Sequence, residues 1–235
     1  MNRQSEKDMT QVTDLPSPQS PVQDWMNSRG AQQRAINGSS FFVRFATDNT
    51  EHKTMQSLGL CDMSGLQKFG LKGRDAESLL RNVNIDVPAN IFESRRLVDD
   101  GLIIRFGADE FFLENGIRNK SVSVISRQLD LQNRQAFHVD HQEATFLLTG
   151  SRVLTVLSQT CGIDFQQATP RQAIFTRVAG VSCCVFPDEA DGFLCYRIWV
   201  DPSYAVYLWD TLVAVCENLG GSVIGAGCIF PELLS

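Results

Sequence analysis

The chain has 235 residues, of which 43% are hydrophobic and 20% are charged, and its formal net charge at pH 7 is −6. The negative charge argues against a phosphate-binding surface, and no apolar stretch approaches the roughly 18 residues that a membrane span needs. The polar amino terminus shows no signal peptide, so we expect a cytoplasmic protein that binds neither nucleic acid nor membranes.

Residues 1–36 are rich in Gln, Ser, Asn, Asp and Pro and carry few large apolar side chains. Such a segment buries too little surface to offset the entropy that it loses on ordering. We therefore expect a disordered polar arm, with one short helical turn near Trp25, followed by a folded domain over residues 37–235.

The pattern of apolar residues changes at the start of this domain. A strand is predicted at 41–45 and a polar helix at 48–57. A strand at 67–72 then leads through Gly73 into a second helix. The face that this helix is expected to bury carries Ala76, Leu79 and Leu80.

Residues 97–115 contain two apolar runs separated by Gly-Ala-Asp, which is typical of a β-hairpin. The following polar stretch, 116–142, is expected to hold a connecting helix near 120–132. It also offers possible metal ligands, but their spacing matches no common zinc motif, so we expect a polar linker and no metal site. These possible ligands are His138, Asp140 and His141.

Residues 145–165 repeat the pattern of residues 68–87. The matched pairs are Phe69 and Phe146, Leu71 and Leu148, Gly73 and Gly150, and Leu80 and Leu157. The second segment is therefore also expected to form a strand, a glycine turn and a helix, with Ser151 as the cap of the helix.

A second pair of strands is predicted at 173–186 and 192–200, joined by the acidic turn Pro-Asp-Glu-Ala-Asp. A helix then begins at Pro202 and ends at the glycine pair 220–221. Its expected buried stripe consists of Tyr204, Tyr207, Leu208, Leu212 and Val215.

The predicted fold class is α+β, built from two pseudo-symmetric strand–helix–strand–strand units. The first repeat covers about residues 41–116, and the second covers about residues 143–228. Each unit is expected to pack its helix on one side of a mostly antiparallel sheet. A cleft between the two units is the natural place for a ligand or a partner.

Few residues suggest chemistry, and no catalytic residue is predicted, because neither a nucleophile elbow nor a glycine-rich phosphate loop is present. Asp99 and Asp100, just before a hairpin strand, form the most suggestive acidic pair, although adjacent carboxylates are also typical of a solvated turn. Arg197 and Trp199 alternate with apolar neighbours on a strand, so they need cover, which a protein partner would supply.

Seven cysteines are present, an odd number without the spacing of a disulfide framework. Nothing indicates a secretory context. We expect buried thiols rather than disulfides.

From residue 41 onward, several short motifs resemble the aminomethyltransferase folate-binding domain, whose family includes the T-protein of the glycine cleavage system. The hairpin "LVDDGLIIRFGADEFFL" and the stretch "GGSVIGAG" resemble later parts of that domain, so the likeness runs from about 41 to 228. The residues that match its opening are Glu51, His52, Gly59, Leu60, Asp62, Ser64, Gly73, Ala76, Leu79 and Leu80.

Within this superfamily, the chain more closely resembles the gamma subunit of heterotetrameric sarcosine oxidase, which lacks the carboxy-terminal barrel of the T-protein. The segments 176–181 and 203–209 carry this resemblance. The Gly-Tyr-Thr-Gly-Glu stretch of the T-protein is replaced here by "PDEAD", and its later Arg-bearing segment is absent. The aspartate that works at the folate in the T-protein falls on Asp99 or on Asp100, depending on where a gap is placed.

The resemblance implies a non-catalytic subunit of a flavin-dependent complex that oxidises sarcosine or a related N-methylated amine. Its expected partners are the large flavoprotein subunits of this hetero-oligomeric oxidase or dehydrogenase. FAD, FMN, NAD and tetrahydrofolate are expected on those subunits, and no cofactor is expected on this chain. Two alternatives are a free-standing folate-binding aminomethyltransferase-like protein and an interaction module with an unrelated partner.

Overall fold

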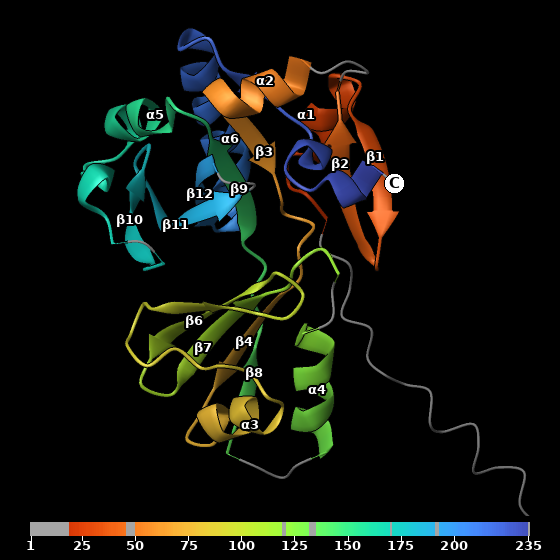
Figure 1. The fold of residues 1–235 in the computed structure, drawn as a ribbon, viewed down its shortest axis with the longest axis vertical. Helices are drawn as coiled ribbons and strands as arrows, with labels where there is room; N and C mark the ends of the chain where they lie inside the picture. Colours follow the sequence, from red (N-terminus) through yellow and green to blue (C-terminus); the bar gives the residue numbers. More distant parts are fainter. Residues whose placement is uncertain are drawn as a thin grey trace, which may run out of the picture.

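The computed structural model describes residues 19–45, 50–118, 121–131, 135–169, 171–190 and 193–234. Two large β-sheets face each other, and each is covered by helices on its outer side (Figure 1). This arrangement confirms the predicted α+β class. Among the described residues, no helix is both long and apolar enough to cross a membrane.

The first sheet has five antiparallel strands. In spatial order they are β5 (Ser94–Arg96), β6 (Leu102–Gly107), β7 (Glu110–Glu114), β4 (Lys68–Lys72) and β8 (Phe137–Val139). Helices α3 (Ala76–Asn82) and α4 (Ser121–Leu131) cover its outer face. The side chains of Ala76, Leu79 and Leu80 are buried there, as the sequence predicts.

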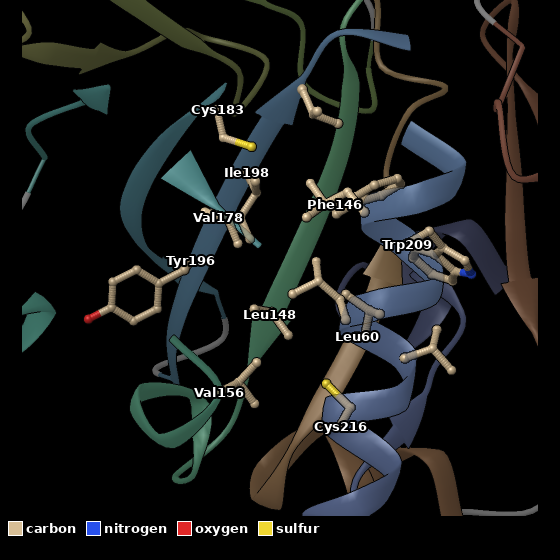
Figure 2. Packing of buried hydrophobic residues seen from close by; sticks show 14 of the residues in the cluster. Leu60, Phe146, Leu148, Val156, Val178, Cys183, Tyr196, Ile198, Trp209 and Cys216 are labelled. Carbon is tan, nitrogen blue, oxygen red and sulfur yellow. The ribbon is translucent and has the colours of Figure 1, made fainter. Parts of the chain in front are cut away.

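The second sheet has six strands. In spatial order they are β10 (Ile174–Val178), β11 (Val181–Ala190), β12 (Phe193–Val200), β9 (Ala144–Thr149), β3 (Gly59–Asp62) and β13 (Ser222–Val223). Helices α5 (Val153–Thr160) and α6 (Pro202–Asn218) cover its outer face. Figure 2 shows Phe146 and Leu148 of β9 packed against Trp209 and Cys216 of α6.

The two halves repeat the same chain path, which confirms the predicted duplication. Strand β4, helix α3 and strands β5 to β7 correspond to strand β9, helix α5 and strands β10 to β12, in the same spatial order. Gly73 and Gly150 lie at equivalent strand-to-helix turns, with φ of 128° and 108°. Both angles lie in the left-handed region, where glycine alone is unstrained.

The strand that leads into each half belongs to the sheet of the other half. Strand β3 precedes β4 in the chain but pairs with β9, whereas β8 precedes β9 but pairs with β4. Each half therefore completes the other, and neither sheet keeps all its strands if the halves separate.

The remaining elements cover the β3 side of the second sheet. They are α1 (Gln23–Ser28), the hairpin β1 (Gln32–Ile36) and β2 (Ser39–Arg44), α2 (Thr50–Ser57), and the short 3₁₀ helices Ala226–Cys228 and Pro231–Leu234. A further 3₁₀ helix, Phe165–Gln167, follows α5 and packs on Tyr196 of β12. Phe41 and Val43 of β2 pack against Ile224 and Ala226.

The structure corrects the boundary of the predicted disordered arm. Val22 and Met26 are buried in the core of the second half, and Trp25 packs edge-to-face on Trp209 with ring centroids 5.5 Å apart. Strand β1 pairs along its length with β2. Residues from Val22 to Ile36 are therefore part of the fold, while residues 1–18 of the predicted arm lie outside the described residues.

The expected acidic turn at 187–191 is wrong, because most of it extends strand β11. Pro187 pairs with Tyr196 of β12, and the pairing continues to Ala190. The pairing of β11 with β10 ends at Val185, so no strand of the described residues lies beside Pro187 on the β10 side. A proline, which has no N–H to donate, is tolerated at such an edge position. The single strand predicted at 173–186 is also wrong, because this segment forms β10 and β11 joined by a turn at Ala179 and Gly180, both with positive φ.

Two details of the second half's helices also differ from the sequence prediction. The cap position of α5 is Arg152, and the backbone N–H of Ser151 donates to the carbonyl of Gln56 at 3.0 Å. In α6, Tyr204 and Tyr207 are exposed. The buried face is instead Ala205, Leu208, Trp209, Leu212, Val213 and Cys216.

Candidate functional site

A pocket of about 760 Å³ lies between the two halves. Its walls come from β6 and β7 of the first sheet, from β10 to β12 of the second, and from the segment that leads into β9. Its lining residues are Phe106, Phe112, Asp140, Gln142, Glu143, Phe175, Thr176, Arg177, Ser182, Cys183, Cys184, Trp199, Asp201 and Pro202. The cleft predicted between the two repeats is therefore present.

Aromatic rings from both halves form the floor of this pocket. Phe112 of β7 meets Trp199 of β12 edge-to-face with centroids 5.2 Å apart, and Phe106 stacks on Phe112 at 5.2 Å. Because alternate residues of a strand point to opposite faces, these side chains leave the helix-covered faces and meet between the sheets.

A buried polar cluster behind this floor is centred on Glu114, at the end of β7. Its carboxylate accepts hydrogen bonds from Arg197 Nη1 at 2.5 Å, Trp199 Nε1 at 2.7 Å and Thr145 Oγ1 at 2.6 Å. The Nζ atom of Lys68 lies 3.6 Å from the same carboxylate. All these groups are buried, so the cluster ties the two sheets together where they face each other.

Arg197 is held by carboxylates from both sheets, because its Nη2 also donates to Asp188 at 3.1 Å. Burial alone would lower the pKa of the guanidinium, but Glu114 and Asp188 outweigh it and raise that pKa. Arg197 is thus a charged structural bridge.

The predicted partner surface at Arg197 and Trp199 is therefore corrected. The sequence shows that both side chains need cover, but the cover comes from the first sheet of the same chain, through Phe112 and Glu114. Both residues are buried.

Asp99 and Asp100 point in different directions. The buried carboxylate of Asp99 accepts from the N–H of Gly101 at 3.1 Å and from that of Ser121, the first residue of α4, at 3.0 Å. Asp100 has φ of 66°, is exposed, and lies 3.6 Å from Arg118. Neither lines the large pocket, and the folate contact inferred for them stays a prediction.

Asp100 instead borders a second pocket of about 400 Å³ on another side of the polar cluster. Arg197 and Asp188 form its inner wall, and Arg96, which is ion-paired with Asp188, lies at its edge. Ile229, Phe230 and Pro231 supply its apolar side.

Glu143 is the principal acidic group of the large pocket. Its Oε1 lies 2.8 Å from Nδ1 of His141, while its buried Oε2 has no hydrogen-bond partner in the described structure. Burial alone would raise the pKa of Glu143, but the hydrogen bond and charge of His141 leave it below its usual value. The pocket thus offers one unsatisfied acceptor beside aromatic walls.

The expected linker around His138 is wrong in its conformation. His138 lies in β8 and stacks on Phe69 with ring centroids 4.3 Å apart. Across the described ranges, no group of three or more His, Cys, Asp or Glu side chains is arranged to hold a metal ion.

All seven cysteines are free thiols, as the sequence predicts, and most are buried. Burial raises the pKa of Cys183, in the pocket wall, to about 11 and that of Cys195 to about 12. A thiol with such a pKa is almost entirely protonated at neutral pH, so neither is an activated nucleophile.

The motif residues that carry the family resemblance have structural roles. Asp62 accepts from the N–H and Oγ of Ser64, whose Oγ in turn accepts from the N–H of Thr145 in β9. The carboxylate of Glu51 accepts from the N–H groups of Phe45 and Gly225. These contacts join the halves and bind the last segment of the chain to α2.

Sequence reasoning missed Glu114 and Glu143. Glu114 ends an apolar strand and resembles an ordinary strand boundary, although an acidic residue facing the same side as Phe112 is a signal for a buried partner. Glu143 follows a polar segment and carries no pattern of its own.

Comparison with known proteins places this architecture in a family. Residues 22–230 match the family model of the GCVT N-terminal domain, and the chain therefore belongs to that family. An aminomethyltransferase of Alkaliphilus metalliredigens is 26% identical over 203 residues, and one of Chlorobium chlorochromatii is 27% identical over 230 residues. The matches cover 79% and 84% of this chain, but only 54% and 58% of those relatives.

Two solved structures share the fold. The glycine cleavage system aminomethyltransferase T of Bartonella henselae superposes with a TM-score of 0.72 at 16% identity, over 88% of this chain and 59% of that one. A chain of the heterotetrameric sarcosine oxidase of Corynebacterium sp. U-96, solved with pyrrole 2-carboxylate, superposes with a TM-score of 0.63 at 16% identity. That match covers 87% of this chain and 97% of the oxidase chain.

Proposed function

We propose that this member of the GCVT N-terminal domain family is a non-catalytic, gamma-type subunit of a flavin-dependent complex that oxidises sarcosine or a related N-methylated amine. The large flavoprotein subunits of the complex would carry FAD, FMN, NAD and tetrahydrofolate. This chain would support their assembly and the transfer of the one-carbon unit to tetrahydrofolate on them.

The observation that carries the proposal is the extent of the likeness to the oxidase chain. The match covers 97% of that chain, but only 54% of the aminomethyltransferase of Alkaliphilus metalliredigens. The structural roles of two buried carboxylates, Asp99 and Glu114, agree with a non-catalytic chain. Asp99 is occupied by backbone amides, and Glu114 is occupied by Arg197, Trp199 and Thr145, so both stabilise the fold.

The proposal is tested by purifying the tagged chain from its native host. Large flavoprotein subunits should co-purify in a fixed ratio and give the visible absorbance of bound flavin. The isolated chain should neither oxidise sarcosine nor bind tetrahydrofolate tightly. Asp100→Asn should leave both the assembly and its activity intact. Tight folate binding by the isolated chain that is lost in Asp100→Asn would contradict the proposal.

One observation favours a second candidate, a free-standing folate-binding protein. The large pocket has aromatic walls and an unsatisfied carboxylate oxygen on Glu143, which suit a flat ring with N–H donors. Titration calorimetry with tetrahydrofolate separates the candidates. If the isolated chain binds in this pocket, Glu143→Gln should abolish the heat of binding and Asp100→Asn should not change it.

A further inference from the structure

A row of aromatic rings runs from the surface of the protein into the large pocket. Phe92 lies 5.5 Å from Phe175, Phe175 lies 5.1 Å from Phe106, and Phe106 continues through Phe112 to Trp199 at centroid distances of 5.2 Å each. We call these five residues the aromatic row. Its inner end is buried, whereas Phe175 and Phe92 are 55% and 36% exposed.

The apolar surface continues beyond the pocket. Ile91, beside Phe92 in the chain, is 49% exposed, and neither residue lines the pocket. A molecule enclosed in the pocket would cover Phe106, Phe112 and Phe175 but would leave Ile91 and Phe92 in water. An occupant that covers the whole row must extend over the pocket mouth, as a protein segment does.

The backbone holds the outer end of the row in a costly conformation. Phe92 has φ of 67°, in the left-handed region that a bulky residue rarely adopts. Its N–H donates to the carbonyl of Arg105 in β6 at 2.7 Å, and its carbonyl accepts from the N–H of Ala173, just before β10, at 2.8 Å, so hydrogen bonds to both halves fix it. Strain of this kind is found where function requires a fixed side chain.

Charges around the pocket select the occupant. Asp140, Glu143 and Asp201 contribute three carboxylates to the lining, and Arg177 contributes one guanidinium. The lining is therefore acidic, and it favours a partner segment that carries Lys or Arg beside its apolar anchor.

We propose that the aromatic row and the pocket behind it form the docking site for a segment of a large flavoprotein subunit. This segment places an aromatic or aliphatic side chain against the exposed faces of Phe106 and Phe175, and a basic residue near Glu143 and Asp140. The inference rests on the proposed function. It assigns the interface to this face of the molecule, and not to Arg197, which is buried.

The test uses Phe175→Ser and Phe92→Asn, with Val98→Ser as the matched control. Val98 is 85% exposed and lies outside the row and the pocket lining. Binding of the purified large subunits to each variant is measured by surface plasmon resonance. Because interface aromatics often act as anchors, the two row variants should weaken binding at least tenfold, and Val98→Ser should not. Raising the salt concentration should weaken the wild-type interaction.

Phe92→Asn separates docking from folding. Asparagine tolerates positive φ, so this variant should keep or raise the melting temperature while it loses affinity. A ring that served only the fold would instead lower the melting temperature and leave affinity unchanged, which would overturn the inference.

The remaining outcomes are distinct. If the wild-type chain assembles with flavoprotein subunits and both row variants assemble equally well, this inference fails and the proposed function stands. If the wild-type chain assembles with no flavoprotein, both fail. If tetrahydrofolate occupies the pocket while the flavoprotein subunits remain bound, a small molecule is the occupant, and the inference also fails.

Discussion

Removing the charge of Glu114 should destabilise the protein severely. Glu114→Gln keeps the size and shape of the side chain but takes one carboxylate out of a cluster that contains Arg197 and Lys68. If the amide oxygen replaces the atom that Trp199 and Thr145 contact, the amide nitrogen faces Arg197 Nη1 across 2.5 Å, donor against donor. The reverse orientation leaves Trp199 and Thr145 without an acceptor.

Breaking a buried pair by removing one partner typically costs about 3–5 kcal/mol, because the remaining charge stays buried. For a chain of this size, 1 kcal/mol lowers the melting temperature by about 2–4 °C, so the expected loss is roughly 6–20 °C. Differential scanning calorimetry measures this shift directly, and urea unfolding gives the change in free energy independently.

Glu110→Gln provides the matched control on the same strand. Glu110 forms an exposed ion pair with Lys72 at 2.9 Å, and exposed pairs contribute little to stability. Its melting temperature should stay close to that of the wild type. Equal shifts for Glu114→Gln and Glu110→Gln would refute the reasoning, since they would mean that burial and the shared hydrogen bonds of Glu114 add nothing.

Three further predictions concern the core, a turn and the pocket. Met26→Ala should lower the free energy of unfolding in urea titrations by about 2–5 kcal/mol, because Met26 is part of the core. An unchanged urea midpoint would instead support the prediction that residues 1–36 form a disordered arm. Gly150→Ala should cost about 1–3 kcal/mol, since φ is positive and a Cβ would lie 2.5 Å from the carbonyl of Ser57, whereas Gly162→Ala meets nothing within 4 Å and should be neutral. Glu143→Gln should reduce stability above pH 4.5, the ordinary pKa, and the difference should shrink as pH falls further, because a carboxyl with a lowered pKa stabilises the fold only while it is ionised. Thermal unfolding between pH 3 and 7 measures that difference, and a gap that widens toward low pH would reverse the sign of the effect.

Local patterns in the sequence predicted many of the helices and strands and the duplication of the fold. Two continuous apolar runs separated by a turn specify strands β6 and β7, and the spacing of Ala76, Leu79 and Leu80 specifies the inner face of α3. Gly73 and Gly150 signalled matching turns because their positive φ is a property of a few neighbouring residues.

The pairing of the strands could not be predicted in the same way. The exchange of β3 and β8 between the sheets depends on contacts between distant segments, which no local pattern encodes. The sequence shows that Arg197 and Trp199 need cover, but it does not say whether that cover comes from another protein or from Glu114 in the other half of the chain. Burial of a polar side chain depends on which distant surface meets it, and that surface exists only once the two sheets have packed.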